Sequence, residues 1–148
     1  MLRYVHTNII AKDAKRLIAF YKNVFDCKSI GETRDISGEW LEQMTGVKNV
    51  HIKGEHLCLP GYGPDHPTLE IFSYNNMIET KAPHTNQIGI AHLAFETDDV
   101  SGKLKEVLAA GGSQYGELVE TIYKDGRKAV FVYAADPEGN IIEIQSWS

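Results

Sequence analysis

The chain has 148 residues, of which 43% are hydrophobic and 24% are charged, a composition typical of one soluble globular domain. The net charge is −5 and basic residues form no long run, which argues against binding to nucleic acid or to an anionic membrane surface. No apolar segment has the length of a membrane span and no signal peptide is evident, so we expect a cytoplasmic protein that acts on a small molecule.

The chain opens with a strand followed by a helix. Alternating side chains over residues 2–10 predict a strand that carries His6 on its more polar face. Asp13 then stands where a helix N-cap is expected. Apolar residues recur after it at helical spacing: Ala14, Leu17, Ile18, Tyr21, Val24 and Phe25.

Three more strands are predicted in the first half, at residues 28–36, 47–59 and 68–74. Residues 53–55 suggest a turn or bulge inside the second of these strands. Residues 37–46 contain Trp40, Leu41 and Met44 and predict a short inserted helix. This insertion either covers a pocket or belongs to the core. Residues 61–67 are rich in turn formers, and a loop is expected over residues 75–87.

The second half begins with the same order of elements. A strand is predicted over residues 88–97, with His92 near its middle. Asp98 or Asp99 caps the following helix, and the glycine pair at 111–112 ends it.

The second half also ends in strands. Residues 119–123 and 128–135 are predicted to form a hairpin through a two-residue turn at Asp125-Gly126. The last strand, over residues 140–147, is entered through a turn at residues 136–139. Both halves therefore follow the order strand, helix, three strands, which indicates an internal repeat.

The repeat places ionisable residues at matching positions. His6 precedes Asp13, and His92 precedes Asp99, by the same number of positions. Each half also ends in a strand with a glutamate between apolar neighbours, Glu70 in the first half and Glu143 in the second.

Side-chain alternation places these two histidines and two glutamates on the same face of their strands. A buried carboxylate is costly unless it is paired, protonated or bound to a cation. Imidazole and carboxylate groups are together a suitable ligand set for a divalent metal. A single histidine in a strand is usually structural, but the matched positions favour a metal site. We expect the other histidines, His51, His56, His66 and His84, to be solvated, although His56 could reach the same face.

Five segments carry a resemblance to a known family. They are Val5-His6-Thr7 and residues 19–25, 68–72, 89–95 and 136–144. With them the whole chain resembles the vicinal oxygen chelate superfamily, which includes glyoxalase I, methylmalonyl-CoA epimerase, extradiol dioxygenases and the fosfomycin and bleomycin resistance proteins.

The resemblance implies an α+β fold in which two βαβββ modules form an open, eight-stranded, barrel-like sheet. The whole chain, 1–148, would be one domain, with module 1 at about 1–74, a linker at about 75–87 and module 2 at about 88–148. It also implies a homodimer. His6, Glu70, His92 and Glu143 match the four ligands of bacterial-type glyoxalase I, for nickel, zinc, cobalt, manganese or iron.

The activity that the resemblance favours is that of a glyoxalase I-type lyase or isomerase. It would act on a small 2-oxo compound or its thiol adduct through a metal-stabilised enolate. Glu143 is our first choice as catalytic base and Glu70 the second. The residues expected to line the substrate pocket are Phe72, Tyr74, Ile90, Gln145, Trp147 and Trp40. No basic cluster for glutathione is evident, and Arg34 or Arg127 could face an anionic substrate.

Three alternatives stay open. A methylmalonyl-CoA-epimerase-like racemase needs a base on each side of the acidic carbon, and epimerases often carry Gln in place of the first carboxylate. A metal-poor binding or resistance protein would lack the ligands. A dioxygenase-type enzyme uses two His and one Glu with further catalytic residues. Cys27 and Cys58 have no motif spacing and are expected to be reduced thiols.

Overall fold

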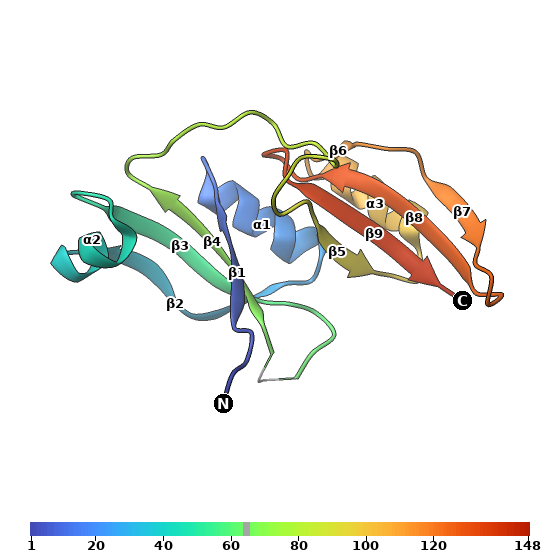
Figure 1. Cartoon of the computed structure of the whole chain (residues 1–148), viewed down its shortest axis with the longest axis horizontal. Coiled ribbons are helices and arrows are strands. Elements are labelled where there is room, and N and C mark those ends of the chain that lie inside the picture. Colours follow the sequence, from blue (N-terminus) through green and yellow to red (C-terminus); the bar gives the residue numbers. More distant parts are fainter. Residues whose placement is uncertain (64–65) are drawn as a thin grey trace. The chain divides into compact units, whose positions relative to one another are not determined.

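The computed structural model describes residues 1–63 and 66–148, so two positions of the predicted turn-rich segment 61–67 lie outside it. The chain divides into two compact units, Met1–Glu79 and Thr80–Ser148 (Figure 1). The described residues form three helices and nine strands, and none of these helices is both long enough and apolar enough to span a membrane.

The first unit forms a four-stranded mixed sheet with the order β1-β4-β3-β2. Strand β1 runs parallel to β4, and the other neighbours are antiparallel. The elements in chain order are β1 (His6–Ile10), α1 (Ala14–Val24), β2 (Lys28–Ser37), α2 (Glu39–Thr45), β3 (His51–Cys58) and β4 (Thr68–Tyr74). This is the predicted βαβββ order with one inserted helix.

The second unit forms a mixed sheet with the order β5-β9-β8-β6, and β7 also pairs with β8. Its elements are β5 (Leu93–Glu96), α3 (Val100–Ala109), β6 (Ser113–Gln114), β7 (Val119–Ile122), β8 (Lys128–Ala135) and β9 (Ile141–Trp147). Because β6 and β7 pair with successive parts of β8, together they occupy the place that β2 has in the first unit. The predicted α+β fold of two βαβββ modules is confirmed, as two mixed sheets, and the described strands form no closed barrel.

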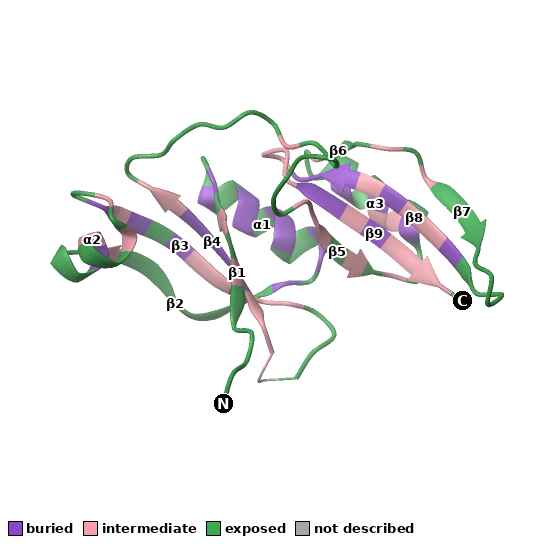
Figure 2. Ribbon diagram, in the orientation of Figure 1, coloured by how far each residue is buried: buried purple, intermediate pink, exposed green. Residues whose placement is uncertain are grey.

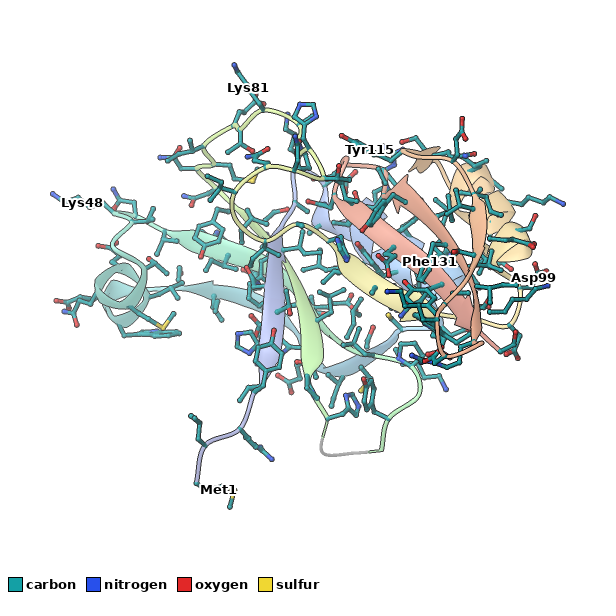
Figure 3. All side chains as sticks on the ribbon, turned by 45° about the vertical axis from the view of Figure 1, so that its right-hand side comes forward. Met1, Lys48, Lys81, Asp99, Tyr115 and Phe131 are labelled. Carbon is teal, nitrogen blue, oxygen red and sulfur yellow. The ribbon has the colours of Figure 1, made fainter. Side chains whose placement is uncertain are left out.

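Both long helices begin at the predicted N-caps. The Asp13 carboxylate accepts a hydrogen bond from the Arg16 amide at 3.0 Å, and the Asp99 carboxylate accepts one from Gly102 at 2.8 Å. These bonds satisfy amides that have no partner inside the helix, and each cap is worth about 1 kcal/mol. Asp99 marks the start of α3 in Figure 3.

Each of the two long helices, α1 and α3, covers one face of the sheet in its own unit. In the first unit α1 packs on β3 and β4, where Leu69 and Ile71 are almost fully buried. In the second unit α3 packs on β8 and β9, where Ile142 and Ile144 are fully buried (Figure 2). Full burial of each such side chain contributes roughly 1.5–3 kcal/mol. The other face of each sheet carries the predicted polar residues.

Three predicted strands start later than the alternation indicates, and one of them is β3, which begins at His51 and not at residue 47. Strand β1 begins at His6 and β5 at Leu93, so Val5, Ile88 and Ile90 lie outside strands and are exposed. The reason is pairing: β5 has only β9 as a neighbour, and their register starts with Leu93 opposite Ile142. Alternation in a sequence does not show where a partner strand ends.

A turn or a bulge was predicted at residues 53–55. Strand β3 runs through these residues without a turn. The irregularity lies in its partner β2, whose register with β3 shifts between Ile30 and Arg34. Gly54 is needed because a Cβ there would lie 2.0 Å from the Ile71 carbonyl oxygen. The close approach of β3 to β4 therefore depends on this glycine.

The hairpin between β7 and β8 is longer than predicted. The Tyr123 amide donates to the Arg127 carbonyl at 2.9 Å, which leaves three residues in the loop instead of two. Gly126 has a φ of 88°, and the Asp125 carboxylate accepts a hydrogen bond from the Arg127 amide. A three-residue loop that ends in a left-handed glycine is a common alternative to the two-residue turn.

The turn before β9 is held by Asp136, which is only 3% exposed. Its carboxylate accepts hydrogen bonds from the Glu138 amide, the Asn140 amide and the Asn140 side chain at 2.8–3.0 Å. The predicted turn is therefore a closed polar network that fixes the start of the strand bearing Glu143.

Candidate metal-binding half-sites

In the first unit, Glu70 lies on β4 between two neighbouring strands. The register places Asn8 of β1 and His56 of β3 directly opposite it. Asn8 Nδ2 donates to Glu70 Oε2 at 3.2 Å, and His6 Nε2 lies 3.3 Å from the same oxygen. His56 Nε2 lies 2.8 Å from Oε1. Both carboxylate oxygens therefore have partners.

Glu70 needs these partners because it is buried, with 8% of its surface exposed. An unpaired buried carboxylate would be strongly destabilising. Burial lowers the pKa of His56 more than the negative charge of Glu70 raises it. We therefore assign His56 as a neutral imidazole at pH 7, with its Nε2–H donating to Glu70.

In the second unit, Glu143 occupies the corresponding place on β9. Ala94 of β5 and Tyr133 of β8 lie opposite it. His92, just before β5, has its Nε2 3.6 Å from Glu143 Oε2. Burial and a hydrogen bond to Glu143 raise the pKa of Tyr133, so its hydroxyl stays protonated and donates to the carboxylate.

The two half-sites share one backbone register. In each unit the residue two positions after the histidine pairs with the glutamate, Asn8 with Glu70 and Ala94 with Glu143. The predicted repeat is thus present in the strand pairing itself. The difference lies in the residue across the sheet, which is His56 in one unit and Tyr133 in the other.

The donor atoms of each pair suit a divalent metal. Two ligands that each lie about 2.1 Å from one tetrahedral ion are about 3.4 Å apart. The observed nitrogen–oxygen separations are 3.3 Å for His6–Glu70 and 3.6 Å for His92–Glu143. Within the described part of the chain, no three or more His, Cys, Asp or Glu side chains are arranged to hold a metal ion. Each pair therefore offers two donor atoms and is a candidate half-site.

Two of the three pocket residues predicted in the first unit, Phe72 and Tyr74, lie on the same strand as Glu70. Phe72 and Tyr74 continue its face of β4, and Phe72 is buried in an apolar cluster with Leu41 of α2. Trp40 of α2 is 56% exposed and lies outside that cluster. The insertion therefore does contribute to the core, through Leu41, and it covers part of the face that bears Glu70.

In the second unit, Gln145 and Trp147 share the face of Glu143. Trp147 Nε1 donates to Gln145 Oε1 at 3.0 Å, and the Arg127 guanidinium lies 4.8 Å from the centre of the indole ring. Phe131, labelled in Figure 3, meets the same ring edge-on at 5.4 Å. Ile90 lies before β5 and is exposed.

Sequence reasoning did not identify two of the residues that contact the carboxylates. His56 was expected either to be solvated or to reach the face of Glu70, and the second alternative is the one observed. Tyr133 was not singled out at all. Alternation along β3 and β8 puts both on the correct face, but only the strand register shows which residue they face.

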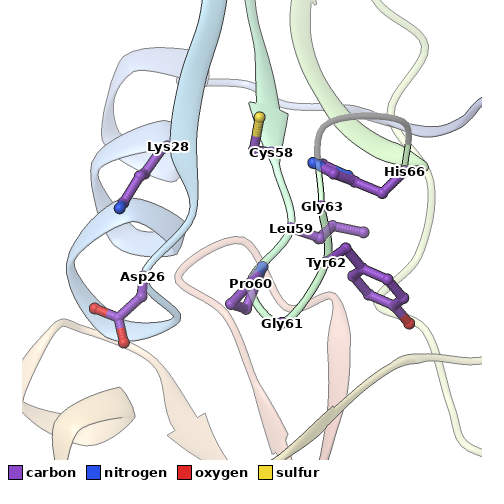
Figure 4. A pocket seen from close by; sticks show the side chains of 9 residues that line it. All are labelled: Asp26, Lys28, Cys58, Leu59, Pro60, Gly61, Tyr62, Gly63 and His66. Carbon is purple, nitrogen blue, oxygen red and sulfur yellow. The ribbon is translucent and has the colours of Figure 1, made fainter.

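A separate pocket of about 450 Å³ lies in the first unit (Figure 4). Its lining includes Asp26, Lys28, Cys58, Tyr62 and His66, and contains neither His6 nor Glu70. Cys58 is half-buried there, whereas Cys27 is buried, and burial with the nearby Asp26 charge raises the pKa of Cys27 to about 12. Both thiols are free, as predicted.

The sequence matches the model of the Glyoxalase/Bleomycin resistance protein/Dioxygenase superfamily over residues 3–144. The chain belongs to this superfamily. No curated protein matches it.

Several solved structures share the fold. A glyoxalase family protein from Bacillus cereus has a TM-score of 0.76 at 17% identity, over 99% of this chain and 93% of that chain. An integron cassette protein from V. cholerae has a TM-score of 0.56 at 22% identity, over 100% and 97%. A glyoxalase I variant from Zea mays has a TM-score of 0.65 at 21% identity, over 97% of this chain but only 44% of that chain.

Proposed function

We propose that this protein is a divalent-metal-dependent lyase or isomerase of the glyoxalase I type. The substrate would be a small 2-oxo compound or its thiol adduct. His6, Glu70, His92 and Glu143 would hold the ion, which is nickel, zinc, cobalt, manganese or iron. The observation that carries this proposal is the pair of matched half-sites, each with one imidazole and one carboxylate at metal-ligand spacing.

When bound, the metal would act as a Lewis acid on a substrate oxygen and stabilise the negative charge that develops beside it. Glu143 is the residue that would move the proton. It would take the proton from the carbon next to the carbonyl and return it to the adjacent carbon. Glu70 has both oxygens held by three side chains, which suits a fixed ligand better than a base.

The remaining groups on these faces would orient the substrate. Gln145 and Trp147 lie on the strand of Glu143, and Phe131 and Arg127 contact the indole ring. In the first unit Arg34 of β2 lies opposite Gly54 of β3. The positive charge of Arg34 contributes to lowering the pKa of His56. One arginine in each unit would favour an anionic substrate.

Metal analysis combined with activity tests this function. The purified protein should contain stoichiometric divalent metal by mass spectrometry, and chelation should abolish turnover of the methylglyoxal–glutathione adduct. Adding nickel, cobalt, manganese, zinc or iron should restore it. A protein that is purified without metal and takes none up would contradict the proposal and favour a metal-free binding or resistance role.

The presence of one carboxylate in each module also suits epimerisation of a 2-substituted acyl-CoA, which needs two bases. That reaction would exchange the α-proton with deuterated water, detected by NMR. The absence of exchange with acyl-CoAs would remove this alternative. Because His56 and Asn8 hold Glu70 in place, we favour the reaction with one base.

We also propose a homodimer. This chain aligns with less than half of the maize glyoxalase I chain, which therefore has the length for two domains of this size. Two copies of the present chain would supply the same number of modules. Light scattering coupled to gel filtration should give twice the mass of 16.5 kDa.

A further inference from the structure

We infer that His56 is a positioning residue that fixes Glu70 as a metal ligand. The inference rests on the proposed function, because it concerns the same carboxylate. It goes beyond the four proposed ligands, because His56 is not one of them.

The two carboxylate oxygens of Glu70 have different contacts. His56 Nε2 contacts Oε1 at 2.8 Å from the neighbouring strand β3. His6 and Asn8, from the opposite neighbour β1, contact Oε2 at 3.3 and 3.2 Å. With Oε1 held by His56, the oxygen that faces His6 is the one presented to an ion.

The His56 ring is itself held in place. It meets the Phe72 ring at 5.7 Å and the His6 ring at 6.2 Å, both edge-on. Phe72 in turn packs in the cluster that contains Leu41 of the inserted helix α2. The insertion thus acts on the half-site through Phe72 and His56, although its own side chains do not contact Glu70 in the contacts described.

Among the described residues, the second half-site has one side-chain donor fewer, because the Tyr133 hydroxyl takes the place of His56 but no donor replaces Asn8. Its carboxylate faces a tyrosine across the sheet and an alanine in place of Asn8. A hydrogen-bonded partner behind a ligand commonly orients it, and its loss typically costs about 10- to 100-fold in metal affinity. The structure therefore assigns a fixed ligand to the first module and the movable carboxylate to the second.

The test compares metal affinity of four proteins by calorimetric titration with Zn²⁺ and Ni²⁺. They are the wild type, His56→Leu, His56→Gln and His51→Leu. Gln keeps an N–H donor near the place of Nε2, whereas Leu removes it. His51→Leu is the matched control, because it makes the same change on the same strand at an imidazole that pairs with Asp35 instead.

We expect His56→Leu to weaken metal binding about 10- to 100-fold. His56→Gln should stay within about threefold of the wild type, and His51→Leu should match it. Circular dichroism and thermal melting of each variant show that it is folded. Unchanged affinity in His56→Leu would overturn the positioning role and leave the proposed function standing.

If His56→Gln binds as weakly as His56→Leu, then the imidazole itself is required and the positioning role is overturned. If the wild type binds neither metal, the proposed function fails and this inference fails with it. If His56→Leu is unfolded, His56→Ala takes its place: a loss of metal affinity in His56→Ala that His56→Gln does not show supports the inference, and unchanged affinity in His56→Ala overturns it.

Discussion

The two carboxylates of this protein have the same place in the backbone and different surroundings. Glu70 is contacted by His6, Asn8 and His56, whereas Glu143 has His92 and Tyr133. The strand registers around them are equivalent. The repeat therefore sets where each carboxylate lies, and the residues across the sheet set how firmly it is held.

The same comparison extends to the edges of the modules. In the first unit β2 is one long strand and α2 packs beside it. In the second unit two short strands replace β2 and no helix is inserted, among the residues that the structure describes. The inserted helix α2 thus occurs in the same unit as Glu70, the carboxylate with more hydrogen-bond partners. This is the physical basis for assigning different roles to Glu70 and Glu143.

The first prediction concerns the two carboxylates, each replaced by an amide in turn. Glu143→Gln should reduce kcat by about 10²- to 10⁴-fold, the usual contribution of a general base, and lower metal affinity far less. Glu70→Gln should act chiefly on metal affinity. Steady-state kinetics and metal titration of both variants measure this. A Glu70→Gln protein that keeps its metal and loses as much turnover would contradict the division of roles.

The next experiment asks whether the two half-sites of the proposed metal site come from one chain or from two. His6→Ala and His92→Ala should each be inactive, because each removes one ligand. If the modules pair across a dimer, mixing and refolding the two variants should restore about a quarter of wild-type activity, since half the dimers are mixed and each has one intact site.

If the modules pair within one chain, the mixture should stay inactive, because every chain then lacks a ligand. Refolded wild type is the control for recovery of activity. The mixing experiment therefore separates the two arrangements without a further structure.

A third prediction concerns the close approach of β3 and β4 in the first module only. Gly54→Ala should lower the free energy of unfolding by about 3 kcal/mol, because the new Cβ would clash with the Ile71 carbonyl. Gly116→Ala is the control, since its Cβ would be 3.9 Å from the nearest atom, and its effect should stay below about 1 kcal/mol. Urea unfolding followed by circular dichroism measures both. Equal stabilities would show that the strands adjust freely.

The smallest effect should come from Tyr133→Phe, which removes the hydroxyl that donates to Glu143. Loss of one such hydrogen bond is worth about 1 kcal/mol, so kcat should fall about five- to tenfold with metal affinity nearly unchanged. A larger loss of metal binding than of turnover would mean that Tyr133 holds Glu143 as firmly as His56 holds Glu70.

Much of the fold followed from local patterns. The bounds of β4 agree with the predicted residues 68–74, and Asp13 and Asp99 cap their helices as expected. These features depend on hydrogen bonds and alternation within a few residues. The starts of β1 and β5 were misplaced because a strand ends where its partner ends, which can be far away in the sequence.

For the candidate site, the sequence predicted that each histidine shares a face with a glutamate, but it did not show which residues contact the two carboxylates across the sheet. His6 and Glu70, and likewise His92 and Glu143, lie within reach of each other, because the repeat and strand parity put them on one face. His56 carries no pattern that distinguishes it from the other histidines. Its importance depends on the register that sets it opposite Glu70.

The sequence by itself determined the modules, the helix caps and the face on which the two histidine–glutamate pairs lie, because these are periodic or short-range properties. Only the tertiary structure decided the register between β3 and β4 and the packing of α2 through Leu41 and Phe72. Those long-range contacts distinguish one carboxylate from the other, since the energy of a buried charge depends on the donors around it.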